Sequence, residues 1–163
     1  MTTCLMCGSR MKTKRENYRY DAVGLPGITL EGVAVSRCGK CGEYEVEIPR
    51  IEDLHRTIAS AVIGKRERLT PAEIRFLRKH IGWSSGRDFA ANMGTTPETV
   101  SRWENGTMPM GPVADRLLRM FVASPRPSGG PPIGLMSRRE KAHPKPLRLA
   151  MKVARGTWRA DAA

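Results

Sequence analysis

Apolar side chains recur at helical intervals through the middle of the chain. Four of them, spaced three, four and four residues apart, predict one helix over residues 51–66; they are Ile51, Leu54, Ile58 and Val62. Between residues 69 and 123 the same periodicity continues in shorter runs, the first three ending at a glycine. Because glycine often follows the last turn of a helix, this region predicts four short helices.

Helix start signals support this division. Thr70-Pro71-Ala72-Glu73 has the form of a capping box with proline at the first helical position, and Thr96-Pro97-Glu98-Thr99 starts a later helix in the same way. That later helix is predicted to run from Pro97 to Asn105, with Gly106 ending it.

The first 50 residues follow a different pattern. Residues 12–20 and 28–38 have the composition of β-strands, and the turn sequence Gly-Leu-Pro-Gly lies between them at 24–27. Residues 43–48 then alternate, so that Tyr44, Val46 and Ile48 are expected on one face of a strand and Glu43, Glu45 and Glu47 on the other. The sequence predicts a small β-rich unit.

The predicted fold class is therefore α+β. A β-rich domain over 1–50 is followed by a linking helix over 51–68 and an all-α domain over 69–123, which gives four to five helices. Residues 124–146 are rich in Pro, Gly and Ser and predict disorder. Residues 146–160 predict an amphipathic helix within this largely disordered tail, since Leu147, Met151, Ala154 and Trp158 are spaced four, three and four residues apart.

Charge points to a polyanionic partner but does not locate its site. The chain of 163 residues has a formal net charge of +12, which favours nucleic acid. Residues 124–163 hold nine Lys/Arg and two Asp/Glu, so +7 of this excess lies in the tail. We expect a cytoplasmic protein with no membrane association, because the sequence has neither a signal peptide nor an apolar run of membrane-spanning length.

Four cysteines form two Cys-x-x-Cys pairs: Cys4 with Cys7, and Cys38 with Cys41. Two such pairs supply four thiolates to one tetrahedral Zn²⁺. The glycines Gly8, Gly39 and Gly42 are expected to allow tight turns around the sulfurs. Zinc would then supply much of the free energy that folds residues 1–50.

Two other roles for the cysteines remain open, namely two disulfides or a redox-active dithiol. A four-thiolate zinc has no open coordination position, so it neither activates water nor binds substrate. The sequence also has no nucleophile–base pattern and no Gly-rich phosphate loop. We therefore expect a protein that is not an enzyme, with a dithiol oxidoreductase as the remote alternative.

The predicted third helix of the all-α domain has the features of a DNA-reading helix. Together with the helix before it, it forms a helix-turn-helix pattern. Val100 and Trp103 are expected to face inward, and the outward candidates for DNA contact are Thr96, Glu98, Ser101, Arg102 and Asn105. Arg102 suits a guanine edge and Glu98 a cytosine amino group. The alternative is a plain helical bundle in which Glu98 and Arg102 form a surface ion pair.

Three stretches of the all-α region, LTPAEIRFLRKHIGWS, DFAANMG and TPETVSRWENG, resemble the Xre-type helix-turn-helix family. With CLMCG, CGKCGEYEVEIP and the linking helix, residues 1–123 resemble the MqsA-like, YgiT-type zinc-finger antitoxins. This resemblance implies a homodimer formed through the helix-turn-helix domain, a palindromic double-stranded operator, repression of the protein's own operon, and a ribonuclease toxin bound by the zinc domain.

The resemblance also assigns roles to particular positions. The base-contacting arginine of the family falls on Arg102, and its base-contacting asparagine falls on Glu98, which is a departure. At the start of the preceding helix the usual glutamine is absent, and Ser85 is the candidate phosphate contact there. The row Glu43, Glu45 and Glu47 could face a basic toxin or form a solvated strand face. A solitary zinc-containing regulator without a toxin is the alternative function.

Overall fold

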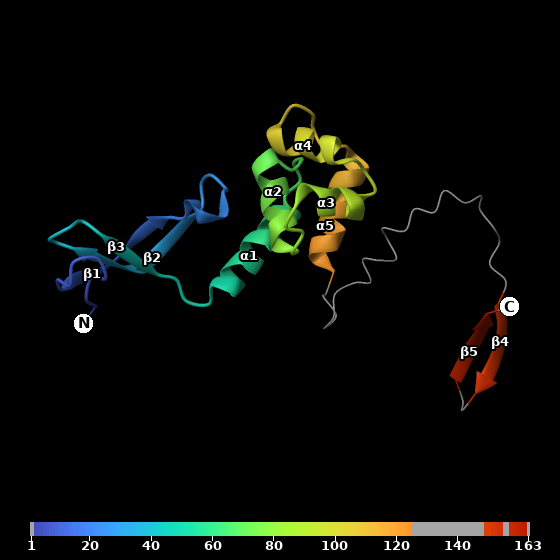
Figure 1. The fold of residues 1–163 in the computed structure, drawn as a ribbon, viewed down its shortest axis with the longest axis horizontal. Helices are drawn as coiled ribbons and strands as arrows, with labels where there is room; N and C mark the ends of the chain where they lie inside the picture. Colours follow the sequence, from blue (N-terminus) through green and yellow to red (C-terminus); the bar gives the residue numbers. More distant parts are fainter. Residues whose placement is uncertain (1, 125–148, 155–156, 163) are drawn as a thin grey trace.

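The computed structural model describes residues 2–124, 149–154 and 157–162. Its N-terminal part is a three-stranded antiparallel sheet in the order β1-β2-β3 (Figure 1). The strands are β1 (Met11–Arg19), β2 (Thr29–Cys38) and β3 (Tyr44–Glu47), and a short 3-10 helix, η1 (Asp21–Val23), lies between the first two. The β-rich unit expected in the first 50 residues is confirmed.

Strand pairing fixes which side chains share a face of the sheet. Val46 pairs with Val35, and Glu45 pairs with Ser36. Because neighbouring residues of a strand point to opposite faces, the expected alternation along β3 is confirmed. At the end of β2, Cys38 pairs with Met11 at the start of β1. This pairing places the loop with Cys38 and Cys41 beside the loop with Cys4 and Cys7, which directly precedes β1.

Five helices follow: α1 (Ile51–Gly64), α2 (Pro71–His80), α3 (Gly86–Met93), α4 (Pro97–Asn105) and α5 (Pro112–Ala123). The predicted bounds of α4 are confirmed. The capping box at α2 is present, since the Thr70 hydroxyl accepts from the Glu73 backbone N–H while the Glu73 carboxylate accepts from the Thr70 N–H. A second capping box at α3, between Ser85 and Asp88, was not predicted.

Glu73 connects the start of α2 to the preceding loop, where Lys65 donates to its carboxylate. Burial opposes ionisation of Glu73, but the Lys65 ammonium and the Thr70 backbone and hydroxyl groups outweigh it and lower the pKa from 4.5. A lowered folded-state pKa stabilises the fold above the ordinary pKa, and this contribution is lost as the pH falls below it.

We therefore expect Glu73→Gln to cost up to about 1 kcal/mol of stability near neutral pH, because the amide can still accept from the Thr70 N–H but no longer pairs with Lys65. The difference from the unsubstituted protein should shrink as the pH falls below 4.5. Thermal melts followed by circular dichroism at neutral and acidic pH measure both effects. Glu31→Gln is the control, since Glu31 is an exposed residue of β2, and a pH-independent difference for Glu73→Gln would contradict the assignment.

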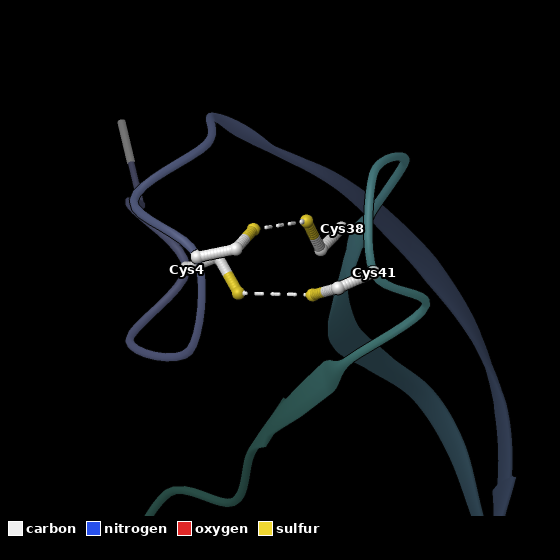
Figure 2. Close-up of side chains that lie close together, drawn as sticks. Cys4, Cys38 and Cys41 are labelled. Atoms are coloured by element: carbon white, nitrogen blue, oxygen red, sulfur yellow. Dashed lines mark hydrogen bonds between the residues drawn. The ribbon is translucent and has the colours of Figure 1, made fainter.

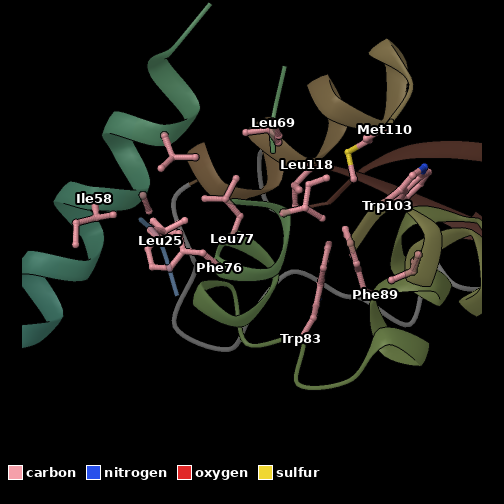
Figure 3. Packing of buried hydrophobic residues seen from close by; sticks show 14 of the residues in the cluster. Leu25, Ile58, Leu69, Phe76, Leu77, Trp83, Phe89, Trp103, Met110 and Leu118 are labelled. Carbon is pink, nitrogen blue, oxygen red and sulfur yellow. The ribbon is translucent and has the colours of Figure 1, made fainter. Parts of the chain in front are cut away.

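One apolar core joins the helices to the near end of the sheet. Leu77, Phe89 and Leu118 are fully buried at its centre, and Trp83 stacks on Phe89 (Figure 3). Tyr20 and Leu25, from the segment between β1 and β2, belong to the same cluster as residues of α1. The β-rich unit is therefore packed onto the linking helix.

The tail differs from its prediction. Leu149–Ala154 (β4) and Thr157–Ala162 (β5) are antiparallel strands, so the amphipathic helix expected over 146–160 is wrong. The helical spacing ignored Gly156, which is unfavourable inside a helix, and also Val153 and Thr157, which favour strands. It counted Trp158, which favours strands as well. The predicted disorder of 124–146 falls, apart from Ser124, outside the described residues.

Within the described residues, none of the helices combines the length and the apolar character that crossing a lipid bilayer requires.

Candidate metal centre and nucleic-acid interface

The two Cys-x-x-Cys pairs lie in loops with the same backbone structure. In the first loop, the Gly8 N–H donates to the Cys4 carbonyl and the Cys4 N–H donates to the Ser9 carbonyl. In the second, Gly42 donates to the Cys38 carbonyl and Cys38 donates to the Glu43 carbonyl. This repeated pattern turns both pairs of thiols toward a common centre (Figure 2).

Glycine is needed at the end of each loop. Gly8 and Gly42 have φ angles of 70° and 77°, a region that residues with a Cβ rarely adopt. Gly39 was expected to serve the same purpose, but its φ is not positive. The glycine directly after each cysteine pair is therefore the conformationally required one.

The sulfur positions fit a single tetrahedral metal ion. The Cys4 and Cys41 sulfurs are 3.5 Å apart, as are those of Cys7 and Cys38, and all four lie within 4.8 Å of one another. A tetrahedral ion with metal–sulfur bonds of about 2.3 Å requires sulfur separations of roughly 3.8 Å. All four are free thiols, and Cys4 and Cys38 are buried.

Hydrogen bonding to the sulfurs favours the thiolate form that metal binding requires. Hydrogen bonds from the Ser9 hydroxyl and backbone lower the pKa of Cys7 to about 6. Backbone N–H groups of Cys41 and Lys40 lower the pKa of Cys38. For Cys41 the backbone N–H of Glu43 acts in the same direction, but the three neighbouring thiols together raise its pKa to about 12. Four thiols this close cannot all ionise without a cation among them.

The second site is built around α4, which packs against α2 and α3. Val100 and Trp103 are its buried residues, and Phe89 of α3 meets the Trp103 ring edge-on. The inward face predicted for α4 is therefore confirmed.

A buried ion pair, which sequence reasoning missed, fixes α4 to α2. The Arg78 Nε donates to a Glu104 carboxylate oxygen at 2.6 Å, and Arg78 Nη1 donates to the Trp83 and Ser84 carbonyls. Arg78 is 6% exposed. One guanidinium thus links α2, the loop before α3 and α4. Because Arg78 and Glu104 lie 26 residues apart, neither shows a local signal.

The opposite face of α4 is free for a ligand. All five α4-region candidates, Thr96, Glu98, Ser101, Arg102 and Asn105, are exposed. The Asn105 amide donates to the Ser101 hydroxyl, and Glu98 lies close enough to Arg102 for the arginine to contribute to its lowered pKa, after its own backbone N–H and the Thr96 hydroxyl. The structure therefore brings these side chains together on one outward surface.

Two of the residues predicted to contact DNA, Thr96 and Ser85, also cap helices in the fold. Thr96 is the N-cap of α4, with its hydroxyl accepting from the Thr99 N–H. Ser85 is the N-cap of α3 and accepts from the Asp88 N–H. Both hydroxyls are exposed at helix N-termini, where an anion is also favoured.

The acidic row at β3, made of Glu43 just before the strand and of Glu45 and Glu47 within it, lies apart from α4 in the β-rich unit. Glu43 and Glu47 are exposed and Glu45 is half-buried. Tyr44, on the other face of β3, is 46% exposed, and the guanidinium of Arg37 lies over its ring. No hydrogen bond or ion pair of these three carboxylates occurs within the described part of the chain.

Comparison with known families assigns a class to the helical domain. Residues 74–121, from α2 to α5, match the family model described as helix-turn-helix (HTH_3). The match and the exposed face of α4 together define a DNA-binding domain of the kind found in transcription regulators. A search of curated proteins finds no match to the chain.

Proposed function

We propose that this protein is a sequence-specific, double-stranded DNA-binding transcription regulator whose N-terminal domain is held by one structural Zn²⁺. The proposal rests on the exposed face of α4. The opposite face of this helix is buried through Val100 and Trp103, and the helix belongs to the matched helix-turn-helix domain. A nine-residue helix reaches only a few base pairs. A homodimer that places two copies of α4 on a palindromic operator would supply the specificity that one copy lacks.

Zinc is the metal that best suits the donor set. Four thiolates in tetrahedral array are the usual ligands of structural zinc. With Cys4, Cys7, Cys38 and Cys41 all engaged, the ion would have no position for water or substrate, and we propose that the protein is not an enzyme. Cys41, the exposed member of the set, would be shielded from oxidation by coordination.

Arg102→Ala tests base readout. We expect a loss of about 1–3 kcal/mol in binding the preferred duplex and a relaxed preference at one base-pair position, because an arginine that forms two hydrogen bonds to guanine is removed. The preferred duplex is first selected from a random pool by the full chain, and affinities are then measured by fluorescence anisotropy.

Arg56→Ala is the matched control, since it removes the same charge from an exposed position of α1 that is not among the predicted DNA contacts. An Arg102→Ala protein whose affinity falls equally for every sequence would show that Arg102 binds phosphate instead. Failure of the unsubstituted chain to select any duplex would overturn the regulator assignment.

We further propose that the regulator is the antitoxin of a type II pair, repressing its own operon and neutralising a small ribonuclease. The resemblance of residues 1–123 to the YgiT-type antitoxins supports this role, and the unpartnered carboxylates Glu43, Glu45 and Glu47 offer a surface for a basic toxin. Co-expression with the product of the adjacent reading frame tests it. Absence of both a ribonuclease-like neighbour and a stable complex would leave a solitary regulator.

A further inference from the structure

The loop between α1 and α2 and the first turns of α5 enclose a hollow of about 200 Å³. Five basic and two acidic side chains line it. Two of the basic groups are already engaged: Lys65 pairs with Glu73, and Arg119 pairs with Asp115. Arg119 also donates to the carbonyls of Ile63, Lys65 and Glu67, which holds the loop in place.

The remaining arginines of the hollow are Arg66, Arg68 and Arg116, and all three are exposed. Ten arginines lie between residues 50 and 124. Seven of them have a carboxylate or carbonyl partner, or an acidic neighbour that they act on electrostatically: Arg50, Arg56, Arg75, Arg78, Arg87, Arg102 and Arg119. Among these ten described arginines, the three without such a partner are the three that share this hollow.

The hollow lies past the C-terminal end of α4. Gly106, which caps α4, packs so close to Pro71 at the start of α2 that an added Cβ would come within 3.2 Å of the proline ring. The segment 107–111 then leads directly to Pro112, which lines the hollow. A helix of nine residues is about 14 Å long and the major groove about 12 Å wide. With α4 in the major groove, its C-terminal end would therefore lie near the edge of the groove, where the phosphate backbone runs.

We propose that Arg66, Arg68 and Arg116 bind backbone phosphates of the DNA duplex whose bases α4 reads. This inference rests on the proposed function. Guanidinium groups bind phosphate oxygens through paired, charge-assisted hydrogen bonds, and such contacts position a reading helix without carrying sequence information. Glu67 also lines the hollow, but a single carboxylate leaves the three arginines with a clear excess of positive charge.

The experiment compares the full chain with its Arg66→Gln/Arg68→Gln/Arg116→Gln variant. Affinity is measured from about 50 to about 200 mM salt for the selected duplex and for a scrambled duplex of equal length. Each lost phosphate contact lowers the salt slope by about 0.9, so the slope should fall by up to about 2.7. Over that range the unsubstituted chain then loses roughly 40-fold more affinity than the variant. Base preference should be unchanged.

The matched control removes the same charge from the β-rich unit, through Arg10→Gln/Lys12→Gln/Lys14→Gln, three exposed residues in and beside β1. Its slope should stay at the unsubstituted value. An unchanged slope for the hollow variant, or an equal fall in the control, overturns the proposal. If the full chain selects no duplex, the salt dependence for the scrambled duplex still tests whether the hollow binds phosphate. Failure of the phosphate proposal can therefore be told apart from failure of the base-reading proposal.

Discussion

Replacing Cys38 by serine is expected to abolish zinc binding and unfold the β-rich domain. Binding of structural zinc supplies about 10–16 kcal/mol in small zinc domains, and the end of the sheet that carries the cysteines buries few other residues. The cluster around the metal site contains Cys4, Met11 and Cys38 as its buried residues. Removing one thiolate opens the site and leaves the remaining sulfurs without a shared cation.

Two measurements on the purified full chain check this expectation. Metal analysis should fall from about one zinc per chain to well below that level, and amide resonances of β1 to β3 should collapse toward random-coil positions. Ser36→Ala is the matched control, because Ser36 lies two residues away in β2 and is also buried. Unchanged zinc content with intact sheet resonances in Cys38→Ser would refute the structural role.

The same preparation separates zinc from redox chemistry. With zinc bound, few thiols should react with a thiol reagent, and all four should react after chelation. A metal-free protein that cycles between two thiols and a disulfide would instead support the oxidoreductase alternative. The near-identical hydrogen bonding of the two loops favours the metal, since both pairs present their sulfurs in the same way.

Much of this architecture could be predicted because its signals are local. The cysteine spacing, the Thr70 and Thr96 caps and the alternation of β3 each involve residues a few positions apart. Periodicity was a weaker guide at α5, where the spaced apolar residues Val113, Leu117, Met120 and Phe121 predict the inward face. Leu118 is fully buried, whereas Val113 and Met120 are 80% and 66% exposed, and only packing against the other helices decides between them.

What could not be predicted depends on contacts between distant segments. The hollow forms because Arg119 of α5 binds carbonyls more than 50 positions earlier in the chain. The strands β4 and β5 form by pairing with each other. The helical spacing of apolar residues over 146–160 gave no indication of this pairing. In each case a residue's partner is set by the fold, so neither charge nor periodicity along the chain identifies it.

Glu104→Ala is expected to destabilise the helical domain by about 3–5 kcal/mol, because it leaves the buried Arg78 guanidinium without its countercharge. The Arg78 and Glu104 side chains are 8% and 14% exposed, so water cannot replace the carboxylate. Urea unfolding followed by helical circular dichroism measures the loss. Glu98→Ala is the matched control on the same helix, where an exposed carboxylate should matter by a few tenths of a kcal/mol.

The double variant Arg78→Met/Glu104→Leu distinguishes the unpaired charge from the loss of packing. Replacing both members of a buried ion pair by apolar residues of similar size is often close to neutral, so the double variant should recover most of the stability. It should nevertheless bind the selected duplex less well, because Arg78 also holds the Trp83 and Ser84 carbonyls that precede α3. A double variant no more stable than Glu104→Ala would show that the Arg78 hydrogen bonds to the Trp83 and Ser84 carbonyls, and not the unpaired charge, determine the stability.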